Sequence, residues 1–245
     1  MMPAVFVHGV PDTCRVWDRL RENLSRADVI ALSLPGFDSP LPEGFTSTKE
    51  EYVDWIIAQI EQQGEPVDLV GHDWGCILVA RVASLRPDLI RTWAAGDAPV
   101  NRDYVWHALA KIWQTPDVGK EWMKELEPDE FIATLVDHGV PADLAPEVMS
   151  KMDATMKSCI LRLYRSAVTV GREWQPGLAN ITSPGLVFWG IHDIPCPVEF
   201  ADRLGSDTGA SRVLKLDGQH WTPVERAKEL AAALEQHWKA TAPIR

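Results

Sequence analysis

The sequence predicts an α/β fold in which a mainly parallel sheet is covered by helices on both faces and interrupted by a helical insertion. Short apolar segments of strand length alternate along the chain with segments whose apolar residues recur at helical spacing. Strands that alternate with helices imply a parallel sheet with both faces buried. The alternation covers residues 1–99 and resumes at 182–245, and we assign these two ranges to one core domain. Residues 100–181 form the insertion.

The expected strands are compact apolar segments, and the helices between them carry start and stop signals. We assign strands to 3–8, 29–32, 67–70, 92–95, 185–189 and 212–216, and helices to 13–25, about 48–63, 74–85 and about 224–239. Thr48 and Glu51 form a capping-box pattern at the start of the second helix. Pro87 limits the helix that starts at Trp74, because the residue before a proline disfavours the helical conformation.

The insertion between residues 100 and 181 has no strand pattern, and proline opens its helical segments. Three prolines stand where the first turn of a helix is expected: Pro116, Pro128 and Pro146. The segment 129–138 ends at Gly139, a residue type that favours a helix C-cap. Residues 147–170 read as one long amphipathic helix. We expect these helices to form a cap over the functional site.

Length and charge limit the classes of function. A chain of 245 residues can bury a sizeable core in one domain. Its net charge of −11 argues against nucleic acid or an anionic membrane as a partner. We expect no membrane insertion, since no apolar run approaches the roughly 18 residues of a spanning helix, and no signal peptide. The four cysteines lack metal-site spacing, so free thiols in a cytoplasm and no metal are expected.

The central motif is Gly71-His-Asp-Trp-Gly75, which joins an apolar strand to a helix. A Gly-x-Ser-x-Gly sequence in this setting forms a strained turn, the nucleophile elbow, which lifts its central side chain above the sheet. Here Asp73 replaces the serine. Aspartate is already an anion at neutral pH, since its reference pKa is about 3.9. A carboxylate that attacks sp³ carbon leaves an alkyl ester on the protein, which water must then cleave.

An acid and a base follow late strands of the predicted sheet. Asp193 follows one strand, and His220 follows the next, 27 residues later. Ligand crevices of such sheets lie at the carboxyl ends of the strands, so both side chains are expected near Asp73. Asp97 also ends a strand and remains an alternative acid. Structural roles are favoured for the other histidines. His8 is expected beneath the loop after the first strand, His72 in the elbow but pointing away from the face of Asp73, His192 next to the acid, and His138 and His237 on surface helices.

Five motifs together resemble the α/β-hydrolases that use an aspartate nucleophile. They are His8-Gly-x-Pro11, Leu34-Pro-Gly-Phe37, Gly71–Gly75, Gly190-x-x-Asp193 and Gly218-x-His220. They resemble the epoxide hydrolases and, equally, the related haloalkane and haloacid dehalogenases. The resemblance implies a triad of Asp73, His220 and Asp193, with backbone N–H groups of Val10 and Trp74 as the oxyanion hole. Because the strands that usually precede His-Gly are absent, we expect a sheet of about six strands.

Residues of the insertion favour the epoxide hydrolases. Tyr164-Arg165 matches the Tyr-Arg pair that places a proton donor in the cap of that family. A second donor is usually another tyrosine, and a subset uses histidine roughly sixty residues earlier. His107 lies 57 residues before Tyr164, and Tyr104 is the alternative. The mechanism implied is attack of Asp73 on an epoxide carbon with donation from Tyr164 and His107, without metal or organic cofactor.

The dehalogenase alternative depends on indole groups that could hold a halide. Trp74 could donate its N–H, and Trp106 or Trp113 could be the second donor. The asparagine that many haloalkane dehalogenases carry after His-Gly is replaced by Val10, and the arginine of fluoroacetate dehalogenases by Trp74. We expect a small apolar substrate and water in a pocket that includes Trp74, Trp106, Trp113 and Tyr104, in a monomer or homodimer. A non-catalytic binding module is a further alternative, although such a module needs no complete triad.

Overall fold

Six parallel strands form a single sheet in the computed structural model, which describes residues 2–241. In spatial order the strands are β2 (Val29–Leu32), β1 (Ala4–Val7), β3 (Val67–His72), β4 (Ile90–Gly96), β5 (Gly185–Gly190) and β6 (Arg212–Leu216). The predicted fold and the number of strands are confirmed. Every residue of β1, β3 and β5 is buried, as expected for strands with helices on both faces.

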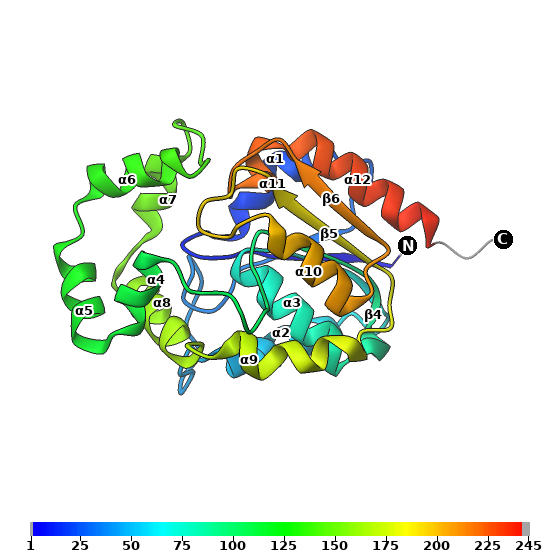
Figure 1. Ribbon diagram of the computed structural model, residues 1–245, viewed down its shortest axis with the longest axis horizontal. Coiled ribbons are helices and arrows are strands. Elements are labelled where there is room, and N and C mark those ends of the chain that lie inside the picture. Colours follow the sequence, from blue (N-terminus) through cyan, green and yellow to red (C-terminus); the bar gives the residue numbers. More distant parts are fainter. Residues whose placement is uncertain (1, 242–245) are drawn as a thin grey trace.

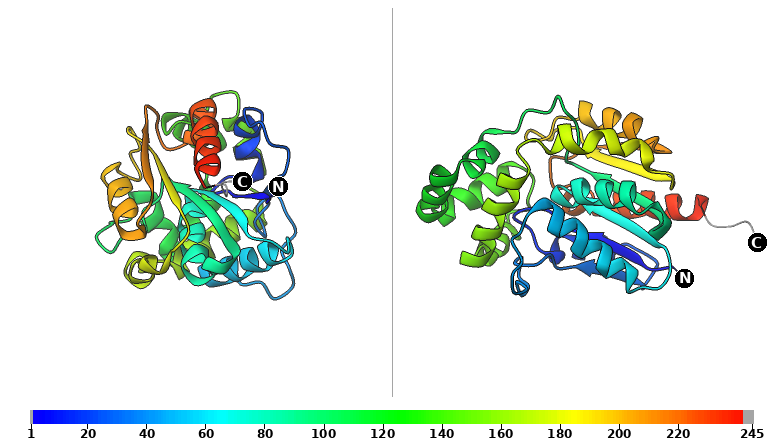
Figure 2. Two further views of the ribbon diagram at one scale, coloured as in Figure 1. Left: turned by 90° about the vertical axis from the view of Figure 1, so that its right-hand side faces the viewer. Right: turned by 90° about the horizontal axis from the view of Figure 1, so that it is seen from below.

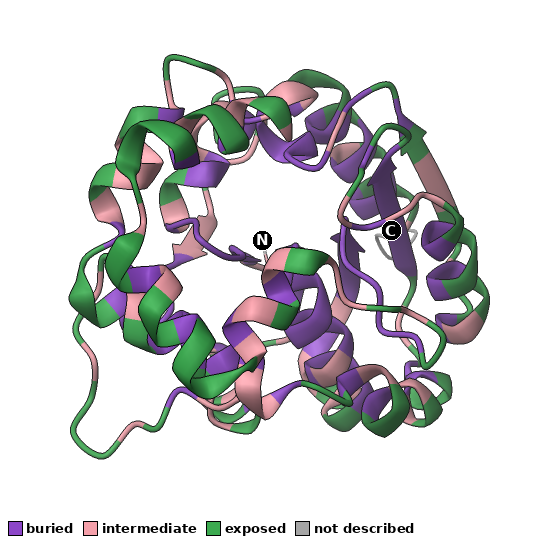
Figure 3. Ribbon diagram, turned by 60° about the vertical axis from the view of Figure 1, so that its left-hand side comes forward, coloured by how far each residue is buried: buried purple, intermediate pink, exposed green. Residues whose placement is uncertain are grey.

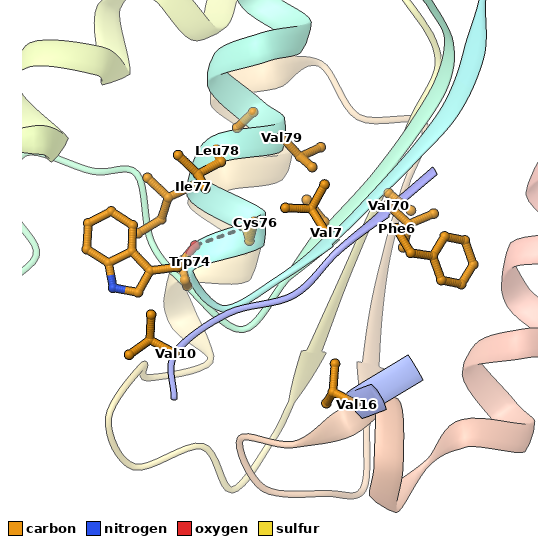
Figure 4. Close-up of a cluster of buried hydrophobic side chains, with 14 of the residues drawn as sticks. Phe6, Val7, Val10, Val16, Val70, Trp74, Cys76, Ile77, Leu78 and Val79 are labelled. Atoms are coloured by element: carbon orange, nitrogen blue, oxygen red, sulfur yellow. Dashed lines mark hydrogen bonds between the residues drawn. The ribbon is translucent and has the colours of Figure 1, made fainter. Parts of the chain in front are cut away.

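Helices cover both faces of the sheet (Figures 1 and 2). One face carries α1 (Asp18–Arg21), α11 (Thr222–Glu225) and α12 (Ala227–Ala240), together with the 3₁₀ segment η1 (Cys14–Trp17); the other carries α2 (Lys49–Glu61), α3 (Trp74–Leu85) and α10 (Glu199–Thr208). A short 3₁₀ turn, η2 (Pro87–Leu89), follows α3. Alternate residues of β1 serve the two faces, because Phe6 points away from α3 and Val7 points toward it (Figure 4).

The helices of the insertion lie beyond the carboxyl ends of the strands (Figure 1). They are α4 (Ala108–Gln114), α5 (Pro116–Glu125), α6 (Pro128–Asp137), α7 (Ala145–Lys151) and α8 (Ala154–Ser166). Their outer sides are largely exposed and residues on their inner sides are buried (Figure 3). The chain returns through α9 (Val170–Trp174) and η3 (Gln175–Asn180), and η3 packs against α3. The division of the chain at 100 and 181 stays a prediction.

Two long helices predicted from the sequence are shorter in the structure. The segment 147–170 is interrupted at Met152, and Asp153 then caps α8 by accepting a hydrogen bond from the Met156 N–H at 2.8 Å. An N-cap aspartate is a start signal that an amphipathic pattern alone does not reveal. The segment 13–25 forms only η1 and the single turn of α1. By contrast, α5 and α6 begin at Pro116 and Pro128 as predicted.

All four cysteines are free thiols, in agreement with their spacing in the sequence. Within residues 2–241, every helix is too short or too polar to cross a lipid bilayer.

A buried ionic network closes the amino end of the sheet. The Asp68 carboxylate on β3 is fully buried and accepts hydrogen bonds from the Arg26 guanidinium at 2.8 Å, the Thr92 hydroxyl at 2.6 Å and the Arg91 guanidinium. The Arg26 side chain is itself only 6% exposed. Removing the carboxylate would leave a buried cation with part of its charge uncompensated.

We therefore expect Asp68→Ala to lower the free energy of unfolding by about 3 kcal/mol, since a buried ion pair that loses one partner is strongly destabilising. Urea unfolding followed by circular dichroism would measure the change. Asp88→Ala removes an exposed partner of Arg86 and should barely alter the midpoint. Equal effects of the two changes would contradict a special role for the buried network.

Candidate active site

Asp73 occupies a strained turn between β3 and α3, as the motif predicted. Its backbone has φ 54° and ψ −122°, a conformation that non-glycine residues rarely adopt. The Asp73 N–H donates to the Gly96 carbonyl at 3.1 Å, and the Asp73 carbonyl accepts from the Cys76 N–H at 2.8 Å. A Cβ atom at Gly75 would lie 2.0 Å from the Val7 carbonyl oxygen, so the turn packs directly against β1. The strain is therefore held by neighbouring strands on both sides.

The two carboxylate oxygens of Asp73 have different partners. Oδ1 accepts a hydrogen bond from the Val10 N–H at 2.7 Å, and Oδ2 lies 3.4 Å from His220 Nε2. The carboxylate approaches the first loop so closely that a Cβ atom at Gly9 would lie 2.2 Å from Oδ1. Although burial alone would raise the pKa of Asp73, His220 and the Val10 N–H hold it below its usual value. Asp73 is therefore ionised at neutral pH.

His220 connects Asp73 to Asp193. Its Nδ1 lies 2.8 Å from Asp193 Oδ2, and the other oxygen of Asp193 accepts from the Cys196 N–H at 2.7 Å. Burial lowers the pKa of His220, but the charge and hydrogen bond of Asp193, together with those of Asp73, raise it well above the usual value. Burial raises the pKa of Asp193, an effect that His220 opposes. The three predicted residues thus form one continuous hydrogen-bonded chain.

Asp97, the alternative acid, is bound elsewhere. Its buried carboxylate accepts from the Gly190 N–H at 2.8 Å and from the Thr222 hydroxyl, and lies 3.6 Å from His72 Nε2. Burial and the nearby Asp193 raise its pKa well above the usual value. Asp97 therefore joins the ends of β4 and β5 to α11, while Asp193 is the carboxylate bonded to the ring of His220.

A cavity of about 350 Å³ lies over Asp73, between the core and the inserted helices. Its lining includes every pocket residue predicted from the sequence: Val10, Asp73, Trp74, Tyr104, Trp106, His107, Trp113, Tyr164 and His220. Other lining residues are mainly apolar, among them Ile77, Phe131, Leu135 and Ile194. Trp74 and Ile77 project from α3 on the side of Val10, away from the strands (Figure 4). The lining contains no lysine, arginine or glutamate, and Asp73 is its one carboxylate.

Tyr164 lies in a cluster of aromatic rings. It is 3% exposed, and its ring makes edge contacts with Trp74 and Trp113 at centroid distances of 5.2 and 4.9 Å. Trp106 stacks on Trp74 at 6.0 Å. Burial and the charge of Asp73 raise the pKa of the Tyr164 phenol well above its usual value. The phenol therefore keeps its proton throughout the neutral range.

The structure distinguishes the two alternatives for a second donor. The Tyr104 hydroxyl donates to the Pro195 carbonyl at 2.8 Å, so its proton is engaged. His107 caps α4, because its Nδ1 accepts from the Ala110 N–H at 3.3 Å. Burial lowers the pKa of His107 to about 4, so the neutral ring carries its hydrogen on Nε2. Of these two residues, His107 has the N–H that remains free to donate.

Two buried indole groups are also unpaired. The N–H groups of Trp74 and Trp113 have no hydrogen-bond partner within the described residues, and both side chains line the cavity. Buried N–H donors without a partner are uncommon and indicate groups available to a ligand.

A metal site at this position would have to use Asp193, Cys196 and His220, whose ligand atoms lie within 4.8 Å of one another. The Asp193 carboxylate already holds the His220 ring, and burial raises the pKa of the Cys196 thiol well above its usual value. A protonated thiol is a poor metal ligand. The donor set therefore suits a hydrogen-bonded pair better than a metal.

Sequence reasoning misplaced two histidines and missed two residues near His220. His237 is buried on α12 and is not a surface residue. His138 is half-buried and lines the cavity, and its carbonyl accepts from the His220 N–H at 3.2 Å. The missed residues are Asp12 and Trp221, which are hydrogen-bonded to each other at 2.9 Å. The one signal in the sequence is that Asp12 directly follows the His8–Pro11 motif and Trp221 directly follows His220.

Comparisons with known proteins point to one family. The sequence pattern of the alpha/beta hydrolase family matches residues 4–233. An (E)-2-((N-methylformamido)methylene)succinate hydrolase of Acinetobacter baylyi is 22% identical, over 98% of this chain and 91% of its own. A haloalkane dehalogenase of Bradyrhizobium diazoefficiens is 23% identical, over 94% of this chain and 84% of its own.

Solved structures share the fold at low identity. An esterase from Thermogutta terrifontis superposes with a TM-score of 0.81 at 18% identity, covering 98% of this chain and 90% of its own. A loop variant of a haloalkane dehalogenase from Bradyrhizobium elkanii gives 0.75 at 17% identity, covering 98% and 91%.

The charge arrangement predicts that the pKa of His220 depends on Asp73. Removing an anion next to an imidazolium makes the charged form less favourable, so Asp73→Ala should lower the pKa of His220. Titration of the histidine Cε1–H signals by NMR would measure this. Asp217→Ala, which removes an exposed carboxylate beside His192, should leave His220 unchanged. A His220 pKa that does not move in Asp73→Ala would contradict the coupling.

Proposed function

Because the chain belongs to the alpha/beta hydrolase family, we propose that it opens epoxides to vicinal diols through a covalent ester on Asp73. Its membership of this family, together with its hydrolase and dehalogenase relatives, indicates an enzyme of the hydrolase type. The specific reaction rests on Tyr164, a protonated phenol that lines the same cavity as an ionised aspartate. An epoxide needs both groups, because its leaving oxygen stays attached to the substrate and must gain a proton.

In the first step, Asp73 Oδ2 attacks one epoxide carbon and the bond from that carbon to oxygen breaks. Oδ1 accepts a short hydrogen bond from the Val10 N–H at 2.7 Å, whereas Oδ2 has the longer contact with His220 at 3.4 Å, so Oδ2 is the oxygen that forms the new bond. The developing alkoxide takes a proton from Tyr164, and the His107 N–H stabilises the same oxygen. General-acid assistance of this kind contributes roughly 10²–10⁴-fold.

In the second step, His220 removes a proton from water and the resulting hydroxide attacks Cγ of the ester. Esterification neutralises Asp73, one of the two anions that raise the pKa of His220, so the pKa of His220 falls. The ring then releases its proton, which restores the phenol of Tyr164, and in its neutral form it can accept a proton from water. Asp193 orients the ring and stabilises the imidazolium. Negative charge collects on Oδ1, where the Val10 N–H, and by family resemblance the Trp74 N–H, stabilise it. Collapse breaks the bond from Cγ to the alkyl oxygen, which takes a proton from His220 and leaves as the diol. The carboxyl group of Asp73 then returns its proton to His220.

The lining of the cavity supports an uncharged, apolar substrate. A carboxylate in the substrate would need a cationic partner when desolvated. The lining contains no lysine or arginine, and both ring nitrogens of His220 already face carboxylates. Haloacids, and acids such as the succinate derivative named for the Acinetobacter relative, are therefore disfavoured. Aromatic rings of Trp74, Trp106 and Tyr164 favour a flat or hydrocarbon substituent.

A second candidate, haloalkane dehalogenation, is supported by the indole pair. The unpaired N–H groups of Trp74 and Trp113 could hold a departing halide. A halide is a weak base that needs polarised N–H donors and no proton, so this reaction would use the same Asp73 and His220 without Tyr164.

His220→Gln should trap the ester, because the first step needs no base and the second does. We expect an adduct on Asp73 equal in mass to one substrate, detectable by intact-protein and peptide mass spectrometry after mixing with styrene oxide. Asp73→Ala combined with His220→Gln is the control and should give no adduct at this position. Sustained turnover by His220→Gln without an adduct would refute the two-step scheme, and absence of any adduct with epoxides and haloalkanes would favour a binding module.

Tyr164→Phe distinguishes the two reactions, because it removes the proton donor and keeps the ring. For an epoxide, ester formation should slow by roughly 10–10³-fold, the cost of one lost transition-state donor. Rapid-quench measurements with styrene oxide and with 1-bromobutane would separate diol from released bromide. Trp113→Phe is the matched change to an indole donor. Bromide release that survives Tyr164→Phe and fails in Trp113→Phe would replace the epoxide reaction with dehalogenation.

A further inference from the structure

Asp12 is a buried carboxyl group that the proposed reaction does not use. It lies two residues after Val10 and is 3% exposed. Its Oδ2 accepts a hydrogen bond from the Trp221 indole N–H at 2.9 Å, between residues that are 209 apart in the sequence. Among residues 2–241, no lysine or arginine forms an ion pair with it. The Trp221 indole is therefore the partner that accounts for its orientation.

Trp221 in turn packs against the proposed base. Its ring meets that of His220 edge-on at a centroid distance of 4.8 Å. On the neighbouring side, His72 Nε2 lies 2.8 Å from the His220 carbonyl oxygen, within hydrogen-bond distance. The position of the His220 ring thus depends on Asp193 at one edge and on Trp221 against its side.

The bond between Asp12 and Trp221 joins the two loops that hold the Asp73 carboxylate. One loop supplies the Val10 N–H to Oδ1, and the other brings His220 Nε2 to 3.4 Å from Oδ2. Val10 and His220 act together in the second step, where one stabilises the oxyanion and the other activates water. We propose that Asp12 is a positioning residue that, through Trp221, fixes these two loops relative to each other for hydrolysis of the ester. This inference rests on the proposed function.

Trp221 lines two cavities. One is the active-site cavity and the other is a second recess of about 100 Å³. The second recess is bounded by Asp12, by Val16 of η1 and by residues of α7. The hydrogen bond to Asp12 is therefore a directional contact for an indole whose surroundings are not completely filled by protein.

The acceptor, and not the charge, is the property required of Asp12. Burial raises the pKa of Asp12 to about 7, an effect that the Trp221 hydrogen bond opposes. A carboxyl oxygen accepts from an indole N–H whether or not the group is ionised. Asn at this position keeps an acceptor oxygen, whereas Leu has a similar size and none.

Four variants test the proposal: Asp12→Leu, Asp12→Asn, Trp221→Phe and Trp93→Phe. Trp93→Phe is the matched control, because it removes a comparable indole bond, at 3.2 Å to the Ser183 carbonyl, from a residue of β4 outside the cavity lining. Single-turnover mixing with styrene oxide, followed by quenched mass spectrometry, gives separate rates for ester formation and ester hydrolysis.

We expect Asp12→Leu and Trp221→Phe to slow ester hydrolysis about 10-fold, the effect of one lost buried hydrogen bond, with ester formation changed less than about twofold. Asp12→Asn and Trp93→Phe should resemble the unaltered protein. Equal slowing of both steps, or no slowing, would overturn the proposal, as would Asp12→Asn behaving like Asp12→Leu. Trp221→Phe decides the outcome if Asp12→Leu does not fold.

An independent measurement does not require the reaction. The His220 Nδ1–H proton, bonded to Asp193, should give a strongly deshielded NMR signal, which Asp12→Leu and Trp221→Phe should shift or broaden and Asp12→Asn should preserve. An unchanged signal in Asp12→Leu and Trp221→Phe would overturn the positioning role. If the unaltered protein forms no ester while the signal responds as expected, the proposed function fails and the positioning role survives.

Discussion

The backbone conformation of Asp73 is the constraint on which the rest of the site depends. A positive φ at a non-glycine residue costs on the order of 1–3 kcal/mol and persists only where the surroundings impose it. Here the buried strand β3 ends on one side of the residue, α3 begins on the other, and Gly75 lies against β1. The same contact with β1 brings the Val10 N–H to the carboxylate. Strain in the turn and the position of the Val10 amide are therefore two consequences of one packing arrangement.

Electrostatics then separates Asp73 from the other buried acids near His220. Burial raises the pKa of Asp12, Asp97 and Asp193, whereas Asp73 is held below its usual value. Asp12 and Asp97 have no hydrogen bond to the ring of His220. Asp193 has one, as Asp73 does, but burial and the charge of Asp73 raise its pKa. Four carboxyl groups in one region cannot all ionise around one imidazole. Hydrogen bonds hold the pKa of Asp73 below its usual value, and Asp73 is the one carboxylate that lines the cavity.

The sequence identifies those parts of the site whose geometry is local or follows strand ends. The elbow at Asp73 follows from its two glycines, and Asp193 and His220 are found because parallel strands place their following loops at one edge. The interruption at Met152 depends on a single capping aspartate that an amphipathic pattern hides. The buried position of His237 and the pairing of Asp12 with Trp221 depend on contacts between distant segments. No local sequence pattern reveals the pairing, since Asp12 and Trp221 each resemble an ordinary loop residue when taken alone.

Whether the proposed site suits an alkoxide or a halide as leaving group depends on which of its hydrogen-bond donors can transfer a proton. The phenol of Tyr164 and the indole of Trp74 are in ring contact, so one substrate oxygen or halide could approach both. An indole N–H polarises a departing atom and keeps its proton, which suffices for a weakly basic halide. An alkoxide is strongly basic and needs transfer of the proton itself. In the cavity lining, Tyr164 combines a retained proton with burial beside Asp73, and it is this combination that favours the epoxide over the halide.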